Sequence, residues 1–247
     1  MAIKPMIIHG RIKIGAEALL AEITKHYKGV SLGKDSNGDR LVFKTDLSDE
    51  DFSRLQADLT FFVDNQQLAL ENICNNLDNY RPENDSQRDA LTFINRLLGL
   101  DASYHSAGLF LYGPAGIGKT HLCVAVAKEV FKKTGVRQRY LRAENLNNYV
   151  KYTNKGCLDV PNQTWVIDDL NSPYGIDVYS FREVVLAVHN QGGRIFVTSN
   201  MDYPEFMTKM FFDNEAERLR YHDRIKGMFK DIKVEGKSRR LREAWYK

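Results

Sequence analysis

Residues 113–120 limit what this chain can fold into more than any other stretch. They read Gly-Pro-Ala-Gly-Ile-Gly-Lys-Thr, which fits the pattern G-x-x-x-x-G-K-[ST]. Glycines lack a Cβ, so the backbone can curl tightly and direct successive N–H groups inward around an anion. Lys119 can reach the terminal phosphates of a polyphosphate, and the Thr120 hydroxyl can ligate Mg²⁺. The motif therefore predicts a phosphate-binding loop made by Gly113, Pro114, Ala115, Gly116, Ile117, Gly118, Lys119 and Thr120.

The residues on either side of this loop fit the same interpretation. Residues 109–112 predict a buried strand that enters the loop, and residues 121–130 predict a helix that leaves it. The positive N-terminal dipole of that helix would face the phosphates, with His121 beside the bound nucleotide. A glycine turn that matches the motif by chance is the alternative, and the flanking strand and helix argue against it.

After the loop, short apolar stretches alternate with amphipathic ones. Strands are expected at residues 138–141, 164–167 and 194–197, and helices at 144–152 and 181–189. This alternation predicts an α/β fold whose parallel sheet is covered by helices on both faces. Asp168 and Asp169 follow the second of these strands, and Asn200 follows the third. Because ligands of such sheets bind at the carboxyl ends of strands, these side chains should converge on the phosphate loop.

Each of the three polar residues has a candidate role in ATP hydrolysis. Asp168 can hold Mg²⁺, usually through water, opposite Thr120. Asp169 can orient or deprotonate the attacking water, and Asn200 can hydrogen-bond that water or the γ-phosphate. The alternatives are a turn or helix cap at the aspartates and an ordinary turn at Asn200, because these residue types favour turns.

Residues 1–78 predict a small α+β domain without a catalytic constellation. Strands are expected at residues 6–14, 30–32 and 41–43, and helices at 16–27, from 48 through 59, and from 64 to about 77. A polar break that contains Pro82 sets the boundary between this domain and a second one, residues 79–247. A helix at residues 86–98 opens the second domain.

Charge is distributed unevenly along the chain. Residues 35–89 hold thirteen acidic and five basic side chains, whereas residues 218–247 hold eleven basic and four acidic ones. This asymmetry suggests an acidic face toward a partner and a basic face toward a polyanion. The alternative is that both segments form ordinary solvated surfaces. Charge alone favours this alternative. The absence of a signal peptide or of a long apolar run predicts a cytoplasmic protein that does not enter a membrane.

Several motifs together resemble a known family. Residues 113–120, 166–170 and 197–200 look like an AAA+ ATPase core, with ATP or ADP and Mg²⁺ as its ligands. The segments at residues 79–84, 87–91, 223–225 and 236–243 resemble, more narrowly, the DnaC/IstB group of helicase loaders and transposition helper ATPases. The phosphate loop alone is not specific to this group. The resemblance covers residues 79–243 and implies an AAA+ core with the small N-terminal α+β domain appended.

The resemblance also implies roles for individual residues. Tyr80 and Arg81 match the segment that contacts the nucleotide, and Arg240 matches an arginine that contacts the nucleotide within its own subunit. Arg224 matches the arginine finger that reaches the γ-phosphate of the neighbouring subunit. Arg220, one helical turn earlier, is the alternative finger. Without the resemblance, a solvated basic helix would explain each of these arginines.

The resemblance implies an ATPase that acts as a helicase loader in DNA replication. ATP would drive homo-oligomer assembly, and slow hydrolysis, stimulated by assembly or DNA, would release the partner. Residues 1–78 would bind a replicative helicase or another replication or transposition protein. A transposition helper and a nucleotide-dependent adaptor with little turnover stay open as alternatives. Single-stranded DNA is a candidate ligand of the basic C-terminal region, through Lys226, Lys230, Lys237, Arg239 and Arg242.

Overall fold

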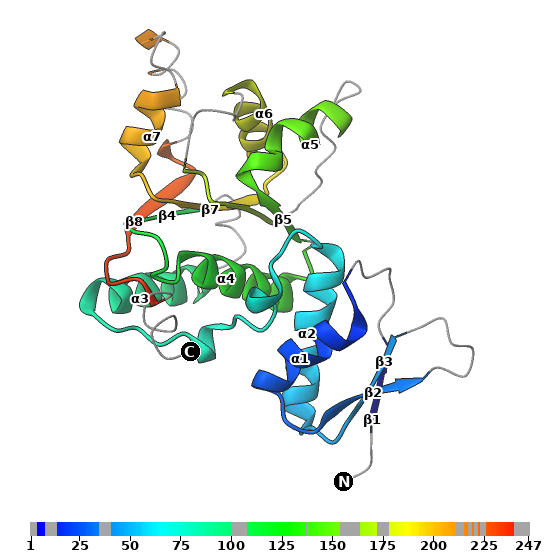
Figure 1. Cartoon of the computed structure of the whole chain (residues 1–247). Coiled ribbons are helices and arrows are strands. Elements are labelled where there is room, and N and C mark those ends of the chain that lie inside the picture. Colours follow the sequence, from blue (N-terminus) through cyan, green and yellow to red (C-terminus); the bar gives the residue numbers. More distant parts are fainter. Residues whose placement is uncertain are drawn as a thin grey trace. The chain divides into compact units, whose positions relative to one another are not determined.

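The computed structural model describes residues 4–7, 14–34, 41–99, 108–136, 138–153, 164–171, 178–210, 215, 216, 219, 222 and 226–239. The chain divides into two compact units, residues 1–75 and residues 76–247 (Figure 1). No helix among the described ranges is both long and apolar enough to span a lipid bilayer.

In the described part of the first unit, three strands form an antiparallel sheet in the order β1-β3-β2. The elements are β1 (Lys4–Ile7), α1 (Ala16–His26), β2 (Val30–Lys34), β3 (Leu41–Thr45), α2 (Asp49–Asp64) and the 3₁₀ turn η1 (Leu70–Asn72). Leu19 and Ile23 of α1, Phe43 of β3, and Leu55 and Leu59 of α2 are buried. This apolar spacing, three or four residues apart on the helices, is the pattern that predicted both helices.

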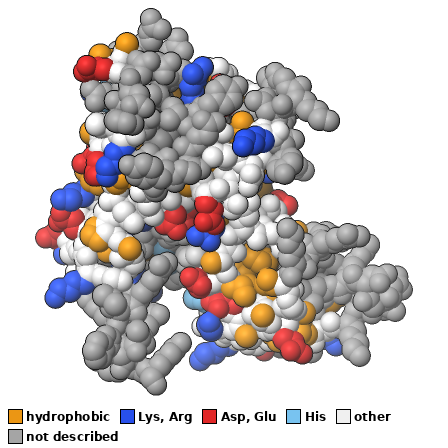
Figure 2. All heavy atoms as spheres, turned by 45° about the horizontal axis from the view of Figure 1, so that its top comes forward, with side chains coloured by type: hydrophobic (Ala, Val, Ile, Leu, Met, Phe, Trp, Pro, Cys, Tyr) orange, Lys and Arg blue, Asp and Glu red, His pale blue; other side chains and the backbone are white. Residues whose placement is uncertain are grey.

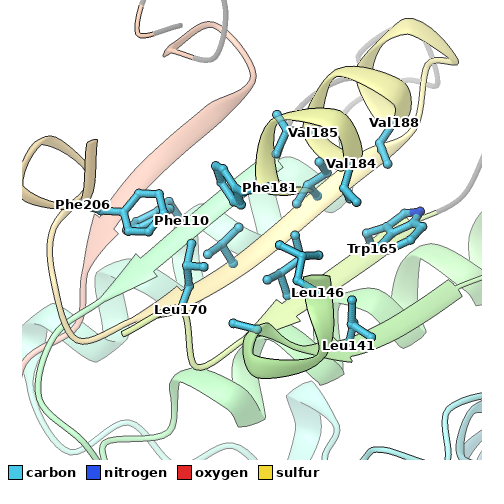
Figure 3. Packing of buried hydrophobic residues seen from close by; sticks show 14 of the residues in the cluster. Phe110, Leu141, Leu146, Trp165, Leu170, Phe181, Val184, Val185, Val188 and Phe206 are labelled. Atoms are coloured by element: carbon cyan, nitrogen blue, oxygen red, sulfur yellow. The ribbon is translucent and has the colours of Figure 1, made fainter. Parts of the chain in front are cut away.

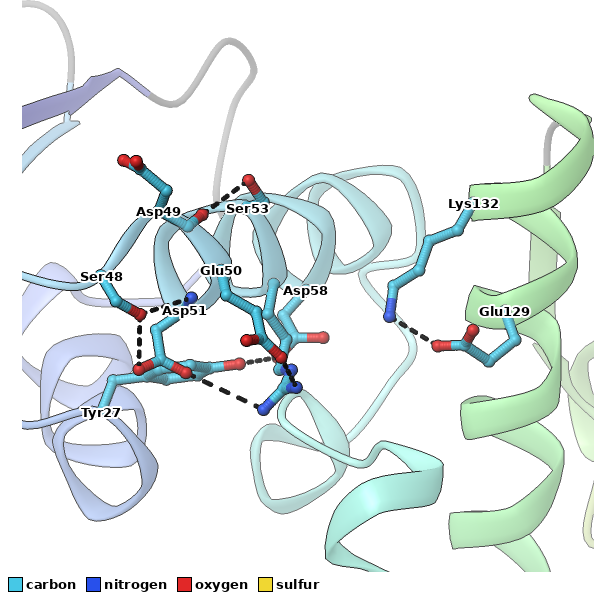
Figure 4. Close-up of polar contacts among 10 residues, drawn as sticks. Tyr27, Ser48, Asp49, Glu50, Asp51, Ser53, Asp58, Glu129 and Lys132 are labelled. Carbon is cyan, nitrogen blue, oxygen red and sulfur yellow. Dashed lines mark hydrogen bonds and ion pairs between the residues drawn. The ribbon is translucent and has the colours of Figure 1, made fainter.

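Polar contacts fix the start of α2 and its packing on the segment after α1 (Figure 4). The Ser48 hydroxyl accepts a hydrogen bond from the Asp51 backbone N–H at 3.1 Å, which caps the helix. Two turns farther along α2, the Tyr27 hydroxyl donates to the buried Asp58 carboxylate at 2.9 Å. Burial, followed by the charge of Asp58, raises the pKa of Tyr27 well above its ordinary value.

The helix expected from residue 64 to about residue 77 is wrong. Helix α2 ends at Asp64, and turns with two short 3₁₀ segments follow in place of a second α-helix. The side-chain amide of Asn65 donates to the Phe61 carbonyl at 2.8 Å, and that of Gln66 donates to the Phe62 carbonyl at 3.2 Å. These amides take the carbonyls of the last helical turn, so the asparagine-rich sequence ends the helix instead of continuing it.

In the described part of the second unit, five parallel strands form a sheet in the order β5-β6-β7-β4-β8. The elements are η2 (Leu77–Asn79), α3 (Asp85–Gly99), β4 (Gly108–Tyr112), α4 (Lys119–Thr134), β5 (Gln138–Arg142), η4 (Ala143–Asn145), α5 (Leu146–Thr153), β6 (Thr164–Asp168), α6 (Val178–Asn190), β7 (Arg194–Ser199), α7 (Tyr203–Met210) and β8 (Phe229–Lys233). Figure 1 shows α3 and α4 on one face of the sheet and α5, α6 and α7 on the other. The predicted parallel sheet with helices on both faces is confirmed.

The apolar core on the face covered by α5, α6 and α7 is drawn in Figure 3. Phe110 of β4, Trp165 of β6, Phe181 and Val185 of α6 and Phe206 of α7 are all almost completely buried. The Phe181 and Phe206 rings meet edge to face with centroids 5.2 Å apart. Each such side chain stabilises the fold by about 1.5–3 kcal/mol. This packing holds the strands, and therefore the loops at their carboxyl ends, in fixed positions.

Two elements were not expected from the sequence, helix α7 and strand β8. Strand β8 pairs in parallel with β4 and places Ile232 opposite Leu111. Its sequence, Phe-Lys-Asp-Ile-Lys, carries three charged residues. Because of this charge, the segment is predicted from the sequence only as part of the basic C-terminal region and not as a strand. Lysines on an edge strand oppose unwanted pairing with other chains, and this use of lysine explains the pattern.

Candidate nucleotide-binding site

The phosphate loop joins β4 to α4 at the carboxyl edge of the sheet, where the motif predicted it. Gly118 ends the loop as the N-cap of α4, and its φ of 97° is a left-handed conformation that favours glycine. A Cβ on Gly118 would come within 2.9 Å of the Tyr80 ring. Both backbone conformation and space therefore require glycine at this position.

Lys119 is the charged centre of the loop. Its ammonium donates to the carbonyls of Gly113 and Pro114, at 2.7 Å each, and to the Asn200 side-chain oxygen at 3.0 Å. The residue is only 6% exposed, so these acceptors offset the loss of water around the charge. Phosphate oxygens are stronger acceptors than neutral carbonyls and can replace them. The structure thus brings Lys119 and Asn200 together, as the strand pattern predicted.

Asp168 lies at the end of β6 and is held by three hydroxyl groups. Oδ1 accepts hydrogen bonds from Thr120 Oγ1 at 2.9 Å and from Thr198 Oγ1 at 2.5 Å, and Oδ2 accepts one from the Tyr140 hydroxyl at 2.6 Å. With 4% of its surface exposed, the carboxylate is fixed in orientation. Burial, and then the neighbouring charge of Asp168, raises the pKa of Tyr140.

The residues present fit a magnesium ion. Thr120 and Asp168 offer oxygen ligands 2.9 Å apart beside the phosphate loop, and Mg²⁺ prefers oxygen from one or two carboxylates, water and phosphate. Among the described residues, no cluster of three or more His, Cys, Asp or Glu side chains forms a fuller metal site. A single buried carboxylate with a hydroxyl suits an ion that keeps most of its water and binds together with a nucleotide.

Asp169 has a backbone conformation that is rare for a residue with a side chain. Its φ is 59°, and its N–H donates to Thr198 Oγ1 at 2.9 Å. Its exposed carboxylate accepts from the Asn171 amide at 3.3 Å, while the Asn171 side-chain oxygen accepts from the Asn200 N–H at 2.7 Å. The turn therefore places Asp169 and Asn200 on the same side of the site, linked through Asn171.

Sequence reasoning missed Tyr140, Thr198 and Asn171. Tyr140 lies on β5, two residues before Arg142. The register of β5 with β6 places Arg142 opposite Asp168. A polar side chain near the end of a strand adjacent to β6 was the available signal, but it required knowing which strands are neighbours. Thr198 was part of the noted strand end, and its hydroxyl orients Asp168 while it accepts from the Asp169 N–H.

The segment before α3 supplies another wall of the site. Tyr80 is 2% exposed, lies against Gly118, and meets the His121 ring edge to face at 5.2 Å. Arg81 is exposed, and its guanidinium donates to the Asp78 carbonyl at 2.5 Å. Tyr80 and His121 therefore adjoin the phosphate loop, whereas Arg81 bonds within its own segment.

The described residues include only some of the basic side chains of the C-terminal region. Arg220, Arg224, Arg240 and Arg242 lie outside the described residues. Lys226, Lys230 and Lys237 are exposed. On the face in Figure 2, the described Lys and Arg side chains lie among Asp and Glu side chains and do not gather into one basic field.

Comparison with known proteins gives one family match and several curated relatives. Residues 43–165 match the family model of the IstB-like ATP binding protein. The chromosomal replication initiator protein DnaA of Acinetobacter baylyi is 30% identical over 135 residues, which are 51% of this chain and 29% of that protein. DnaA of Lactococcus lactis is 30% identical over 102 residues, 37% of this chain and 22% of that protein. The chain thus spans less than a third of the length of these relatives.

Solved structures share the fold at 22% sequence identity. A putative primosome component from Streptococcus pyogenes matches with a TM-score of 0.57, covering 70% of this chain and 92% of that one. DnaI matches with a TM-score of 0.57 over 70% of this chain and 94% of that one. The DnaC helicase loader matches with a TM-score of 0.56 over 68% of this chain and the whole of that one. These likenesses confirm the predicted fold class.

Proposed function

We propose that this chain, whose residues 43–165 match the IstB-like ATP binding protein, is an AAA+ ATPase that hydrolyses ATP to load a helicase in DNA replication. One observation carries the enzymatic part of the proposal. Lys119 bonds to Asn200 at 3.0 Å, and Thr120 bonds to Asp168 at 2.9 Å. Groups for phosphate, metal and water therefore share one edge of one sheet.

The residues divide the chemistry among themselves. Lys119 and the loop N–H groups bind the phosphates, while Thr120 and Asp168 hold Mg²⁺. When bound, the ion neutralises charge that develops on the phosphate oxygens. Asp169 orients the attacking water from its exposed position, and Asn200 hydrogen-bonds the same water or the γ-phosphate. Tyr80 and His121 pack beside the loop and close the wall next to it.

Assembly and partner binding complete the proposal. ATP drives subunits into a homo-oligomer in which Arg224 of one subunit acts on the nucleotide of its neighbour, and Arg240 contacts the nucleotide of its own subunit. The first domain binds a replicative helicase, and the exposed lysines of the C-terminal region contact single-stranded DNA. Support for a loader comes from the likeness to DnaI and the DnaC helicase loader, which extends over almost the whole of those chains.

A second candidate is a transposition helper ATPase. The match of residues 43–165 to the IstB-like model favours it, because that match includes residues of both units and the whole phosphate loop. The two functions share the ATP site and differ in the protein that the N-terminal domain recognises. Only the identity of the partner separates them.

A loading reaction on closed circular DNA tests the proposal. The full-length protein is mixed with the replicative helicase of the same organism, a closed single-stranded circle that carries an annealed oligonucleotide, and ATP or ADP. We expect ATP-dependent release of the oligonucleotide, because a ring helicase cannot thread onto a closed circle unaided. Lys119→Ala should abolish this release and weaken ATP binding at least about tenfold, since the phosphates lose a charged donor.

Two outcomes would contradict the proposal. If the protein binds ATP and leaves the helicase inactive on the circle, helicase loading is refuted. A protein that then stimulates strand transfer by a transposase from the same genome is a transposition helper. If Lys119→Ala binds ATP as tightly as the unaltered protein, the assignment of the nucleotide site is itself refuted.

A further inference from the structure

One wall of the nucleotide site is built by the C-terminal tail, residues 234–239. The Arg239 backbone N–H donates to the Gly116 carbonyl in the phosphate loop at 2.9 Å. The Arg239 guanidinium donates to the Arg81 carbonyl at 2.5 Å and to the Gln87 side-chain oxygen at 3.1 Å. Its central carbon lies 5.1 Å from the centre of the Tyr80 ring. A single residue thus joins the phosphate loop to the segment that precedes α3.

The rest of the tail bonds to the same two regions. The Val234 N–H donates to the carbonyl of Tyr112, the residue before the phosphate loop, at 2.8 Å. The Glu235 carbonyl accepts from the side-chain amides of Gln87 at 2.9 Å and Asn84 at 3.0 Å. The two Glu235 contacts join positions 148 and 151 residues apart in sequence, so the tail acts as a brace across the site.

Two glycines of the phosphate loop are packed by this brace and its partner. Gly116 has a φ of 76°, and the Ser238 hydroxyl occupies the space where its Cβ would lie. Gly118 lies against the Tyr80 ring, and the Arg239 guanidinium lies over that ring. The loop backbone is therefore confined by side chains outside the motif that defines it.

We propose that Arg239 is a positioning residue for nucleotide binding, which clamps residues 80–87 and the phosphate loop into the conformation that accepts ATP or ADP. The inference rests on the proposed nucleotide site and assigns Arg239 a role other than the DNA contact expected from the sequence. Glu83 lies 3.6 Å from Arg239 Nε, so a carboxylate already balances part of the charge that a DNA phosphate would need.

The physical reason is that nucleotide affinity depends on how often the loop holds its binding conformation. Apparent affinity falls in proportion to the fraction of molecules that are competent to bind. Arginine suits the clamp because its planar guanidinium bonds to two acceptors and stacks on an aromatic ring at the same time. Lysine keeps the charge and loses that geometry. Arg239→Lys should therefore resemble Arg239→Gln.

The test compares full-length variants by calorimetry with ATP and with ADP. Arg239→Gln loses hydrogen bonds from a charged group, so it should bind both nucleotides roughly tenfold more weakly. Arg239→Lys should bind both nucleotides several-fold more weakly. Lys132→Gln, which removes an exposed charge in the last turn of α4, at the end of the helix opposite the phosphate loop, is the control and should bind as the unaltered protein does. Amide hydrogen exchange should be faster at residues 113–118 in Arg239→Gln than in the control.

The other outcomes overturn the inference. Unchanged nucleotide affinity together with a weaker salt dependence of DNA binding would return Arg239 to the DNA surface. Weaker binding of ATP alone would make it a γ-phosphate contact, and a lower melting temperature with unchanged affinity and exchange would make it merely structural. If the unaltered protein binds neither nucleotide, the proposed function fails as well, which distinguishes that failure from a failure of the clamp alone.

Discussion

Removing the Tyr140 hydroxyl tests whether the carboxylate of Asp168 is anchored as the structure indicates. Tyr140→Phe deletes one hydrogen bond of 2.6 Å to a buried carboxylate and leaves the ring in place. A hydrogen bond to a charged group stabilises a protein by roughly 1.5–3 kcal/mol. For a unit of this size, each kcal/mol shifts the melting temperature by about 2–4 °C, so a drop of roughly 3–12 °C is expected.

Two further variants test whether the losses of melting temperature follow the order that the hydrogen bonds predict. Thr198→Val removes two hydrogen bonds, one to the Asp168 carboxylate and one from the Asp169 N–H, and should lower the melting temperature more. Tyr112→Phe makes the same chemical change on a strand of the same sheet, where the hydroxyl bonds to no described residue, and should change it least. Equal melting temperatures for Tyr140→Phe and Tyr112→Phe in scanning calorimetry would refute the anchoring argument.

Two other predictions concern the active site and pH. Asp169→Asn should keep ATP affinity, because asparagine tolerates the left-handed φ of 59°, and should lose most turnover because the charge that aligns water is gone; near-normal turnover in a phosphate-release assay would exclude Asp169 from that role. The pKa of Tyr27 is raised in the folded protein above the ordinary 10.0, so its contribution to stability is complete below pH 10 and is lost as the pH rises further. Urea denaturation of Tyr27→Phe should show a shallower loss of stability above pH 10 than that of the unaltered protein, and identical slopes would contradict this.

Local patterns in the sequence were sufficient for the parts of the site that lie next to each other along the chain. The glycine spacing and the flanking apolar strand predict the phosphate loop because loop, strand and helix start within twenty residues. Asp168, Asp169 and Asn200 could also be predicted to converge, since the carboxyl ends of parallel strands share one edge of a sheet. The helix predicted after Asp64 was wrong because side-chain amides in this asparagine-rich stretch bond to the last carbonyls of α2.

The sequence alone determined which residues could bind a phosphate chain and a metal, because that chemistry depends on residue type and on short spacing. Only the tertiary structure decided which distant residues support them. Tyr140 meets Asp168 because β5 pairs with β6, and Arg239 meets Gly116 because β8 pairs with β4 and carries the tail back across the loop. Such contacts depend on the order of strands in the sheet. That order is set by packing over the whole unit, which no short stretch of sequence encodes.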